Sequence, residues 1–334
     1  MLPIDVSIRI YALWEDEMTL LDQIERCWHD SDAEARSCKW AKKLAASQEA
    51  MAEATKLFNE WKPLDVYTCV ADATKSKVTI EFSLRYCGQE VARLSTSNQF
   101  VSLKVSEKTA KNNATNFGTP PDLYGEWDWR SAEATEFRRQ FREASSPAKL
   151  SRVERQIEAA MIRQMLGNSN KFAGTLRDIT PVQFAGCPFQ FPMPLSANKG
   201  YPDGKKGNID ILARRGRGAA NRLSVWELKA PGEERSQSPL EQAYIYSVTL
   251  LKMLRSSCGA TWFRDVLGYE RSLPEKISIE SVAVVSPSNA DDRMKFLDEF
   301  AAFKNNNCWT VGNDEVVPMV AFYQAETLSI ELLP

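Results

Sequence analysis

Histidine is almost absent from this chain, which has 334 residues and one imidazole, that of His29. A single histidine excludes metal sites built from several imidazoles and argues against a Ser-His-Asp or Cys-His catalytic group. The seven cysteines are scattered and contain no C-x-x-C pair. We therefore expect neither a zinc cluster nor a disulfide framework, and reduced thiols typical of a cytosolic protein.

Long apolar runs and a strong charge of one sign are also missing. No stretch approaches the ~18 consecutive apolar residues of a membrane span. The first residues, MLPIDVSIRIYALWEDE, lack the basic start and apolar core of a signal peptide. The net charge of −2 excludes a wholly basic nucleic-acid binder but is compatible with a local basic patch. We expect a cytoplasmic protein without membrane association.

The pattern of the chain divides it into three parts. Residues 1–115 are expected to form an α+β module, because residues 4–10 and 78–86 alternate like strands and the region between them contains a long helical pattern. Residues 116–140 contain glycine and proline and are interpreted as a linker. Residues 141–334 follow the order helix, three strands, helix, strand, which predicts a compact α/β core.

Two charged residues occur in an otherwise apolar strand pattern, VWELKA. Residues two apart on a strand share a face, so Glu227 and Lys229 project together while Trp226 and Leu228 face the core. If the preceding strand pairs with this one through the Gly- and Arg-rich turn, Asp210 lies near residue 227 or 229. The carboxylates of Asp210 and Glu227 would then lie together, and carboxylate oxygens are ligands that Mg²⁺ prefers. The alternative is a solvated strand with a surface ion pair.

This arrangement resembles the PD-(D/E)xK nuclease superfamily. Asp210 follows Ile209 where the motif has proline, and Glu227-Leu228-Lys229 comes after a gap of 16 residues. The resemblance covers about 140–290 and implies an α/β, restriction-endonuclease-like core with a mixed central sheet flanked by helices. It also implies Mg²⁺ as the cofactor, with Mn²⁺ able to substitute. The metal-binding set that it implies is Asp210, Glu227, Leu228 and Glu158.

The resemblance requires a further acid on the helix before the hairpin. Glu154 and Glu158, one turn apart in VERQIEAAM, both qualify. Glu158 is preferred, because Met161, Ile162 and Met165 place apolar residues on the helix face expected beside it. For Glu154 a solvated helix face is the preferred interpretation.

Gln242 and Tyr246 form a Q-x-x-x-Y element on the helix predicted after the hairpin. At positions i and i+4 the two side chains share one helix face. In the superfamily branch found in recombination-associated nucleases, such a pair supports the site and contacts the DNA backbone. We expect Gln242 in the catalytic group and Tyr246 at the nucleic acid, with ordinary helix packing as the alternative.

Positive charge is concentrated near this motif. Between residues 199 and 235 the chain has nine basic and five acidic residues. A basic excess in an acidic protein indicates where phosphates would approach. The expected nucleic-acid contacts are Lys199, Lys205, Lys206, Arg214 and Arg215.

The resemblance therefore implies a Mg²⁺-dependent DNA endonuclease of prokaryotic or phage restriction, anti-phage defence or DNA repair. Its substrate would be duplex DNA, and the chain would form a homodimer or larger oligomer, with residues 1–115 available to a protein partner. The alternatives are an inactive nucleic-acid-binding or assembly protein of the same fold, and an RNase or exonuclease of the superfamily. The expected catalytic residues are Asp210, Glu227, Lys229, Glu158 and Gln242.

Overall fold

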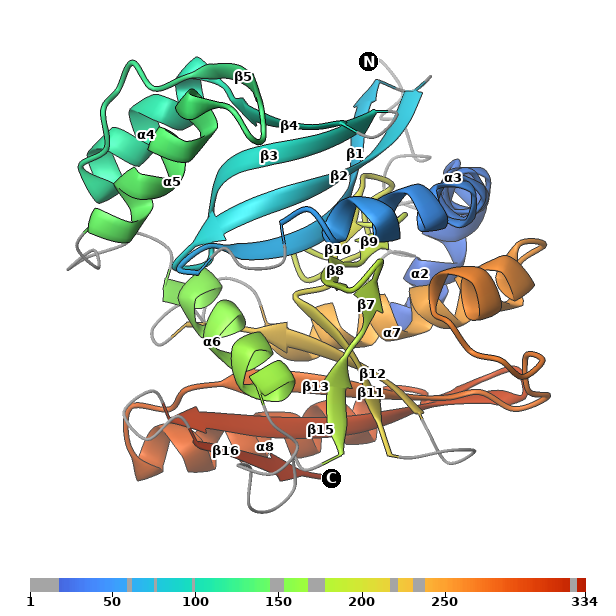
Figure 1. Cartoon of the computed structure of the whole chain (residues 1–334). Helices are drawn as coiled ribbons and strands as arrows, with labels where there is room; N and C mark the ends of the chain where they lie inside the picture. Colours follow the sequence, from blue (N-terminus) through green and yellow to red (C-terminus); the bar gives the residue numbers. More distant parts are fainter. Residues whose placement is uncertain are drawn as a thin grey trace, which may run out of the picture.

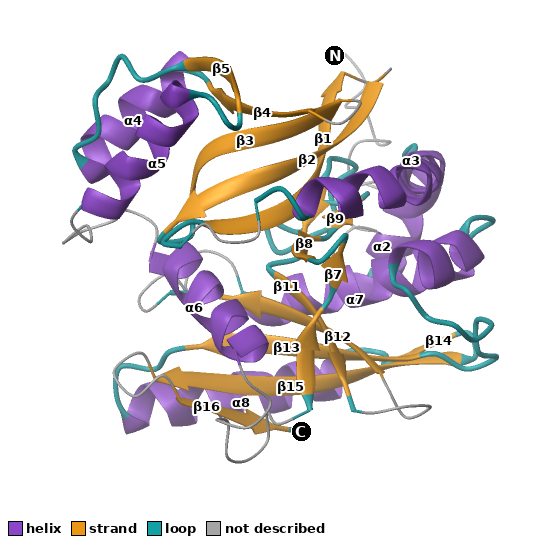
Figure 2. Cartoon of the chain, in the orientation of Figure 1, coloured by secondary structure: helices purple, strands orange, loops and turns teal. Residues whose placement is uncertain are grey.

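The structure is a computed structural model that describes residues 18–58, 62–74, 77–97, 100–144, 153–167, 178–216, 222–230, 238–324 and 329–334. The predicted strand at 4–10 lies outside these ranges. The described chain is mixed α/β, with two large sheets and helices on their faces (Figures 1 and 2). None of its described helices combines the length and hydropathy of a membrane span.

The first sheet has seven strands in the order β5-β4-β3-β2-β1-β8-β7. Its strands and the helices around it are α2 (Leu20–Asp30), α3 (Ala33–Thr55), β1 (Asp65–Thr74), β2 (Lys77–Tyr86), β3 (Gln89–Ser97), β4 (Phe100–Val105), α4 (Glu107–Phe117), β5 (Gly125–Asp128), α5 (Ala132–Glu143), β7 (Gln183–Phe184) and β8 (Cys187–Gln190). The clean alternation of residues 78–86 does produce a strand, β2, which pairs antiparallel with β1 and β3.

The segment 116–140, interpreted as a linker, instead continues this first sheet. Strand β5 pairs with β4, with Leu103 opposite Trp127. Helix α5 then packs back, and the rings of Phe117 and Phe141 meet Tyr86 at centroid distances of 5.1 and 5.4 Å. Residues 183–190, well beyond the predicted linker, also join this sheet, because Phe189 of β8 pairs in parallel with Thr68 of β1.

The second sheet has the order β14-β15-β13-β12-β11-β6, with β16 paired to β15. Its elements are α6 (Val153–Gly167), β6 (Ile179–Pro181), β11 (Ile211–Arg215), β12 (Arg222–Leu228), α7 (Pro239–Arg255), β13 (Ser278–Val285), α8 (Ala290–Asn306), β14 (Thr310–Val311), β15 (Asp314–Gln324) and β16 (Ser329–Leu333). Strands β12, β13 and β15 are parallel, whereas β11 and β12 form an antiparallel hairpin. The sheet is therefore mixed.

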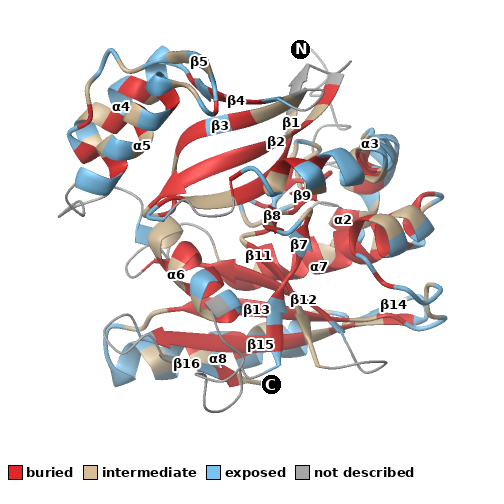
Figure 3. Cartoon of the chain, in the orientation of Figure 1, coloured by how far each residue is buried: buried red, intermediate tan, exposed pale blue. Residues whose placement is uncertain are grey.

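Successive side chains of the parallel strands point to opposite faces of this second sheet, because side chains alternate along a strand, and both faces are buried. On one face, Trp226, Leu228 and Val282 pack with Met161 of α6. On the other, residues such as Val320 pack with α7 and α8. The central strands are accordingly buried in both sheets, whereas the outer sides of the covering helices are exposed (Figure 3).

Helix α6 lies between the two sheets (Figure 1). The turn between β2 and β3 contains Gly88, where an added Cβ would lie 2.0 Å from the carbonyl oxygen of Arg155. Only a glycine allows this approach, and its positive φ of 79° also favours glycine. The first sheet is thus pressed directly against the backbone of α6.

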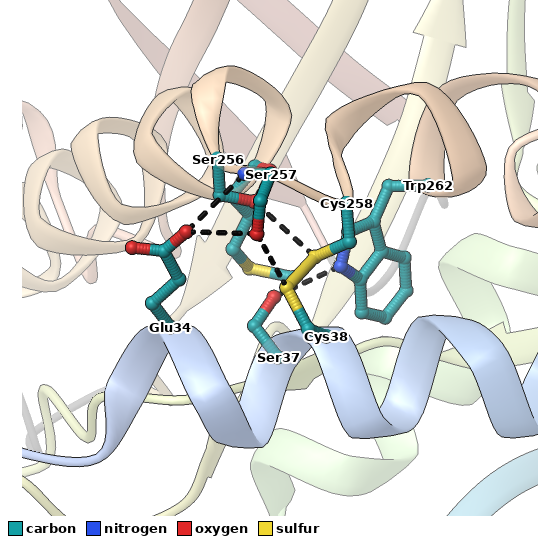
Figure 4. Close-up of a disulfide and its surroundings, with 8 residues drawn as sticks. Glu34, Ser37, Cys38, Ser256, Ser257, Cys258 and Trp262 are labelled. Atoms are coloured by element: carbon teal, nitrogen blue, oxygen red, sulfur yellow. Dashed lines mark hydrogen bonds between the residues drawn. A yellow bond between two sulfur atoms is a disulfide. The ribbon is translucent and has the colours of Figure 1, made fainter.

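The expectation that the thiols are all reduced is wrong for one pair. Cys38 of α3 and Cys258, which follows α7, form a disulfide (Figure 4). Trp262 of the π-helix η2 (Thr261–Val266) donates to Ser37 Oγ at 2.9 Å beside it. Spacing could not reveal this pair, because 220 positions separate the two cysteines. The remaining five cysteines are free thiols.

Candidate functional site

The hairpin of β11 and β12 brings Asp210 to Glu227. Ile211 pairs with Trp226, so Asp210, just before β11, lies opposite Glu227. The Asp210 backbone N–H donates to Glu227 Oε1 at 3.2 Å, and the backbone N–H of Leu228 donates to Asp210 Oδ2 at 2.9 Å. The predicted convergence of these residues is therefore present.

Two of the three charged residues of the motif are withdrawn from solvent, and Asp210 is half-buried. Glu227 is 3% exposed and Lys229 is 8% exposed, which excludes the alternative of a solvated surface ion pair. Burial, and then the negative charges of Glu158 and Glu154, raise the pKa of Asp210 to about 7. Burial and Asp210 likewise raise the pKa of Glu227 well above its usual range. Burial and the neighbouring acids thus disfavour the ionised forms of both carboxyl groups.

Helix α6 contributes both of its candidate acids, each in a different contact. Glu154 Oε2 lies 3.4 Å from Lys229 Nζ, and its side chain is 28% exposed, so it does not lie on a solvated helix face as expected. Glu158 is buried and accepts from Arg85 Nη1 of β2 at 3.2 Å. Burial raises the pKa of Glu158, and Arg85 opposes that shift. The acid in contact with the motif lysine is therefore Glu154.

Arg85 is the site residue that sequence reasoning missed. It is 2% exposed and its guanidinium lies 4.2 Å from the centroid of the Tyr67 ring. The available signal was weak: Glu81, Ser83 and Arg85 occupy alternate positions of β2, which marks a polar stripe on one face of that strand. That polar stripe does not indicate that Glu158 is the partner of Arg85.

Gln242 and Tyr246 lie buried on α7 and hold the chain that leads to Asp210. Gln242 Nε2 donates to the carbonyl of Ala197 at 3.2 Å, and the Ala197 N–H donates to Tyr246 Oη at the same distance. Tyr246 is 1% exposed, so its predicted contact with nucleic acid is replaced by a positioning role. An added Cβ on Gly207 would lie 2.5 Å from Tyr246 Oη.

The predicted basic contacts do not form one cluster. Arg214 and Arg215 are at the opposite end of β11 from Asp210, roughly 13 and 17 Å away at about 3.3 Å per residue. Arg215 pairs with Glu280 at 2.9 Å, and Arg214 lies over the Tyr269 ring at 4.7 Å. These two arginines therefore make contacts within the protein at the far end of β11, and their expected contact with nucleic acid stays a prediction.

The lysines of the segment before Asp210 differ in exposure and in partner. Lys199 and Lys205 are exposed, with Lys199 near the Tyr201 ring and Lys205 paired with Asp203 at 3.2 Å. Lys206 is half-buried and donates to the backbone carbonyl of Val70 on β1. Lys206 thus connects the site loop to the first sheet.

A divalent cation is compatible with this donor set, although the set is small. In the described residues, no three or more His, Cys, Asp and Glu side chains are placed to hold a metal ion. The remaining candidates are the carboxylates of Asp210 and Glu227, which accept hydrogen bonds from the backbone N–H groups of Leu228 and Asp210, respectively. Mg²⁺ is commonly held by one or two carboxylates and keeps its other positions for water and phosphate oxygens.

Comparison of the chain with protein-family models, with curated proteins and with solved structures returns no match.

Proposed function

We propose that this chain is a Mg²⁺-dependent DNA endonuclease with a restriction-endonuclease-like core, in which Mn²⁺ can substitute. The observation that carries the proposal is the pair of reciprocal hydrogen bonds that joins Asp210 to the Glu227-Leu228 backbone and side chain, with Lys229 in the next position. The metal would supply Lewis-acid activation of water and charge neutralisation at the phosphate. Asp210 and Glu227 would hold it, with the Leu228 backbone beside them.

The remaining residues orient the reaction. Lys229, held by Glu154 at 3.4 Å, orients the attacking water and neutralises charge that develops on the phosphate. Glu158 adds to the negative field at Asp210 and is itself held by Arg85. Gln242 and Tyr246 fix the loop that precedes Asp210. Such pre-organisation reduces the rearrangement required during the reaction.

The proposed setting is prokaryotic or phage restriction, anti-phage defence or DNA repair, in the cytoplasm. The Cys38–Cys258 disulfide is unusual for that compartment, so the oxidation state of the purified protein should be measured. Cleavage of both strands by a chain with one site favours a homodimer. Residues 1–115 would then be available to a protein partner.

The test compares supercoiled plasmid, linear DNA and RNA in Mg²⁺, Mn²⁺ or EDTA, for the wild type and for Lys229→Ala. We expect metal-dependent nicking or linearisation of the plasmid, reduced by about 10²–10⁴-fold in the variant, the range for loss of a positioned acid–base group. The matched control is Lys276→Ala, which removes an exposed lysine just before β13 that pairs with Glu315; this variant should cut normally.

Each other outcome has a definite meaning. Equal cleavage by the wild type and Lys229→Ala would overturn the proposed role of Lys229. No cleavage of any substrate in any metal would leave the chain as a non-catalytic binding or assembly protein. Cleavage of RNA alone, or of linear ends alone, would assign the chain to the RNase or exonuclease class.

A further inference from the structure

A polar cavity of about 810 Å³ lies between the first sheet and α6. Residues of β1, β2, β3, α4 and α6 line it, together with two residues just before Asp210, Lys206 and Asn208. Arg85 lines it as well and holds Glu158. The cavity is therefore connected to the candidate site by Arg85, which contacts Glu158, and by Asn208, two positions before Asp210.

The charge of this cavity is opposite in sign to that of the whole chain. Five basic side chains line it against two acidic ones, whereas the chain has a net charge of −2. The basic residues are Arg85, Arg93, Lys108, Arg155 and Lys206, and the acidic ones are Glu81 and Glu90. Arg93 is paired with both acids, at 3.2 and 2.9 Å, and Arg85 is paired with Glu158 behind the lining. Five basic against three acidic side chains still leave an excess of positive charge. A positive excess within a cavity attracts phosphate more strongly than the same charges spread over a surface.

The cavity also offers side-chain amides, which carry both donors and acceptors. They are Gln89, Asn112, Asn116, Gln190 and Asn208. Phosphate requires donors only, whereas the edge of a nucleobase presents donors and acceptors together. Cations and amides in one cavity therefore fit a nucleotide better than they fit an inorganic anion.

The size of the cavity limits what can enter. Cavities of 300–1,000 Å³ take ligands of drug size, which includes one or two nucleotides and excludes a duplex. We propose that this cavity binds an unpaired nucleotide of the substrate strand, next to the phosphate that is cut. This rests on the proposed function, and it makes a duplex with a single-stranded extension, rather than a blunt duplex, the preferred substrate.

The test measures binding in EDTA, so that no cleavage occurs and no metal is needed. Fluorescence anisotropy compares a labelled blunt duplex with the same duplex carrying a single-stranded extension of ten thymidines at either end. We expect about tenfold tighter binding of one of the extended duplexes. The double variant Lys108→Gln, Arg155→Gln should lose this preference and bind the blunt duplex as the wild type does.

Salt dependence gives a second readout of the same contacts. On single strands each phosphate contact contributes about 0.7 to the slope of log affinity against log salt. The slope for the extended duplex should therefore fall by about 0.7 in Lys108→Gln and by about 1.4 in the double variant. The matched control is Lys111→Gln on the same helix, paired with Glu107 and not lining the cavity. If the double variant fails to fold, the single Lys108→Gln variant carries the test.

Failure of this proposal can be distinguished from failure of the proposed function. Equal binding of blunt and extended duplexes, or equal losses in Lys108→Gln and Lys111→Gln, would overturn the cavity proposal even if the plasmid is cut. The expected binding pattern without any cleavage would uphold the cavity and overturn the nuclease assignment.

Discussion

Arg85 of the first sheet and Glu158 of α6 form a buried ion pair, with Nη1 and Oε1 3.2 Å apart and the two side chains 2% and 10% exposed. The pair joins residues that are 73 positions apart. It connects the first sheet to the helix that carries both acidic candidates of the site. The first sheet therefore contributes a positive charge next to the site, that of Arg85, in addition to packing against helix α6.

Replacing Arg85 by methionine should destabilise the protein by about 3–5 kcal/mol, because the variant leaves Glu158 buried without its partner. The double variant Arg85→Met, Glu158→Leu should recover most of that loss. Urea unfolding followed by circular dichroism measures both. Arg139→Met, which removes an exposed helix pair, should change stability little. If Arg85→Met is as stable as the control Arg139→Met, the predicted contribution of the buried ion pair is wrong.

Asp210 makes stability depend on pH in the absence of metal. Its pKa is raised to about 7 in the folded protein from an ordinary value of 3.8, so the folded state binds more protons between these values. Stability should therefore be highest below about pH 4 for this group and should fall as pH rises towards 7. Denaturation in EDTA at pH 5 and pH 8 should show a smaller decline for Asp210→Asn than for the wild type.

Metal binding should stabilise the folded protein more at high pH than at low pH, which is opposite to the effect of Asp210 protonation. A ligand at 100 times its dissociation constant stabilises the folded state by about 2.7 kcal/mol, and ionised carboxylates bind cations better than protonated ones. Adding Mg²⁺ should therefore raise the melting temperature at pH 8 more than at pH 5, and Glu227→Gln should lose this gain. The same gain in Glu227→Gln would place the metal elsewhere.

Gly207 should not tolerate a methyl group. A Cβ there would lie 2.5 Å from Tyr246 Oη and 2.8 Å from the carbonyl oxygen of Leu195. Gly207→Ala should cost about 1–3 kcal/mol as an overpacked site. Adding Tyr246→Phe removes the first clash, so the double variant should lose less than the sum of the single losses. Strict additivity in this cycle, measured by thermal unfolding, would count against the close approach.

The disulfide should contribute to the free energy of unfolding. Cys38 and Cys258 tie α3 to the segment that follows α7 (Figure 4). The double variant Cys38→Ser, Cys258→Ser should lose about 2–4 kcal/mol, the usual contribution of such a link. Cys308→Ser, at an exposed free thiol, is the matched control. If a reducing agent lowers the melting temperature of the wild type no more than that of the double variant, the link does not form in solution.

The sequence by itself determined the hairpin and its contents. The apolar alternation of β12 determined which residues face the core, because a shift of one position would put Glu227 and Lys229 in the apolar cluster that Trp226 and Leu228 form with α6. The short turn made antiparallel pairing with β11 the natural arrangement, and Asp210 then had to meet Glu227. The Gln242 and Tyr246 spacing likewise placed both on one helix face. These are local relations, governed by period and chain connectivity.

Tertiary structure alone decided which distant residues complete the site. Whether Glu154 or Glu158 faces Lys229 depends on how α6 is rotated between two sheets, and residues of both sheets set that rotation. Arg85 and Cys38 find partners 73 and 220 positions away, and no periodicity encodes such distances. Arg214 and Arg215 were expected at the site from their position in the chain, but a strand carries its successive residues steadily away from its start. A charged residue that is close to a motif in sequence is therefore close to it in space only if the fold brings the two together.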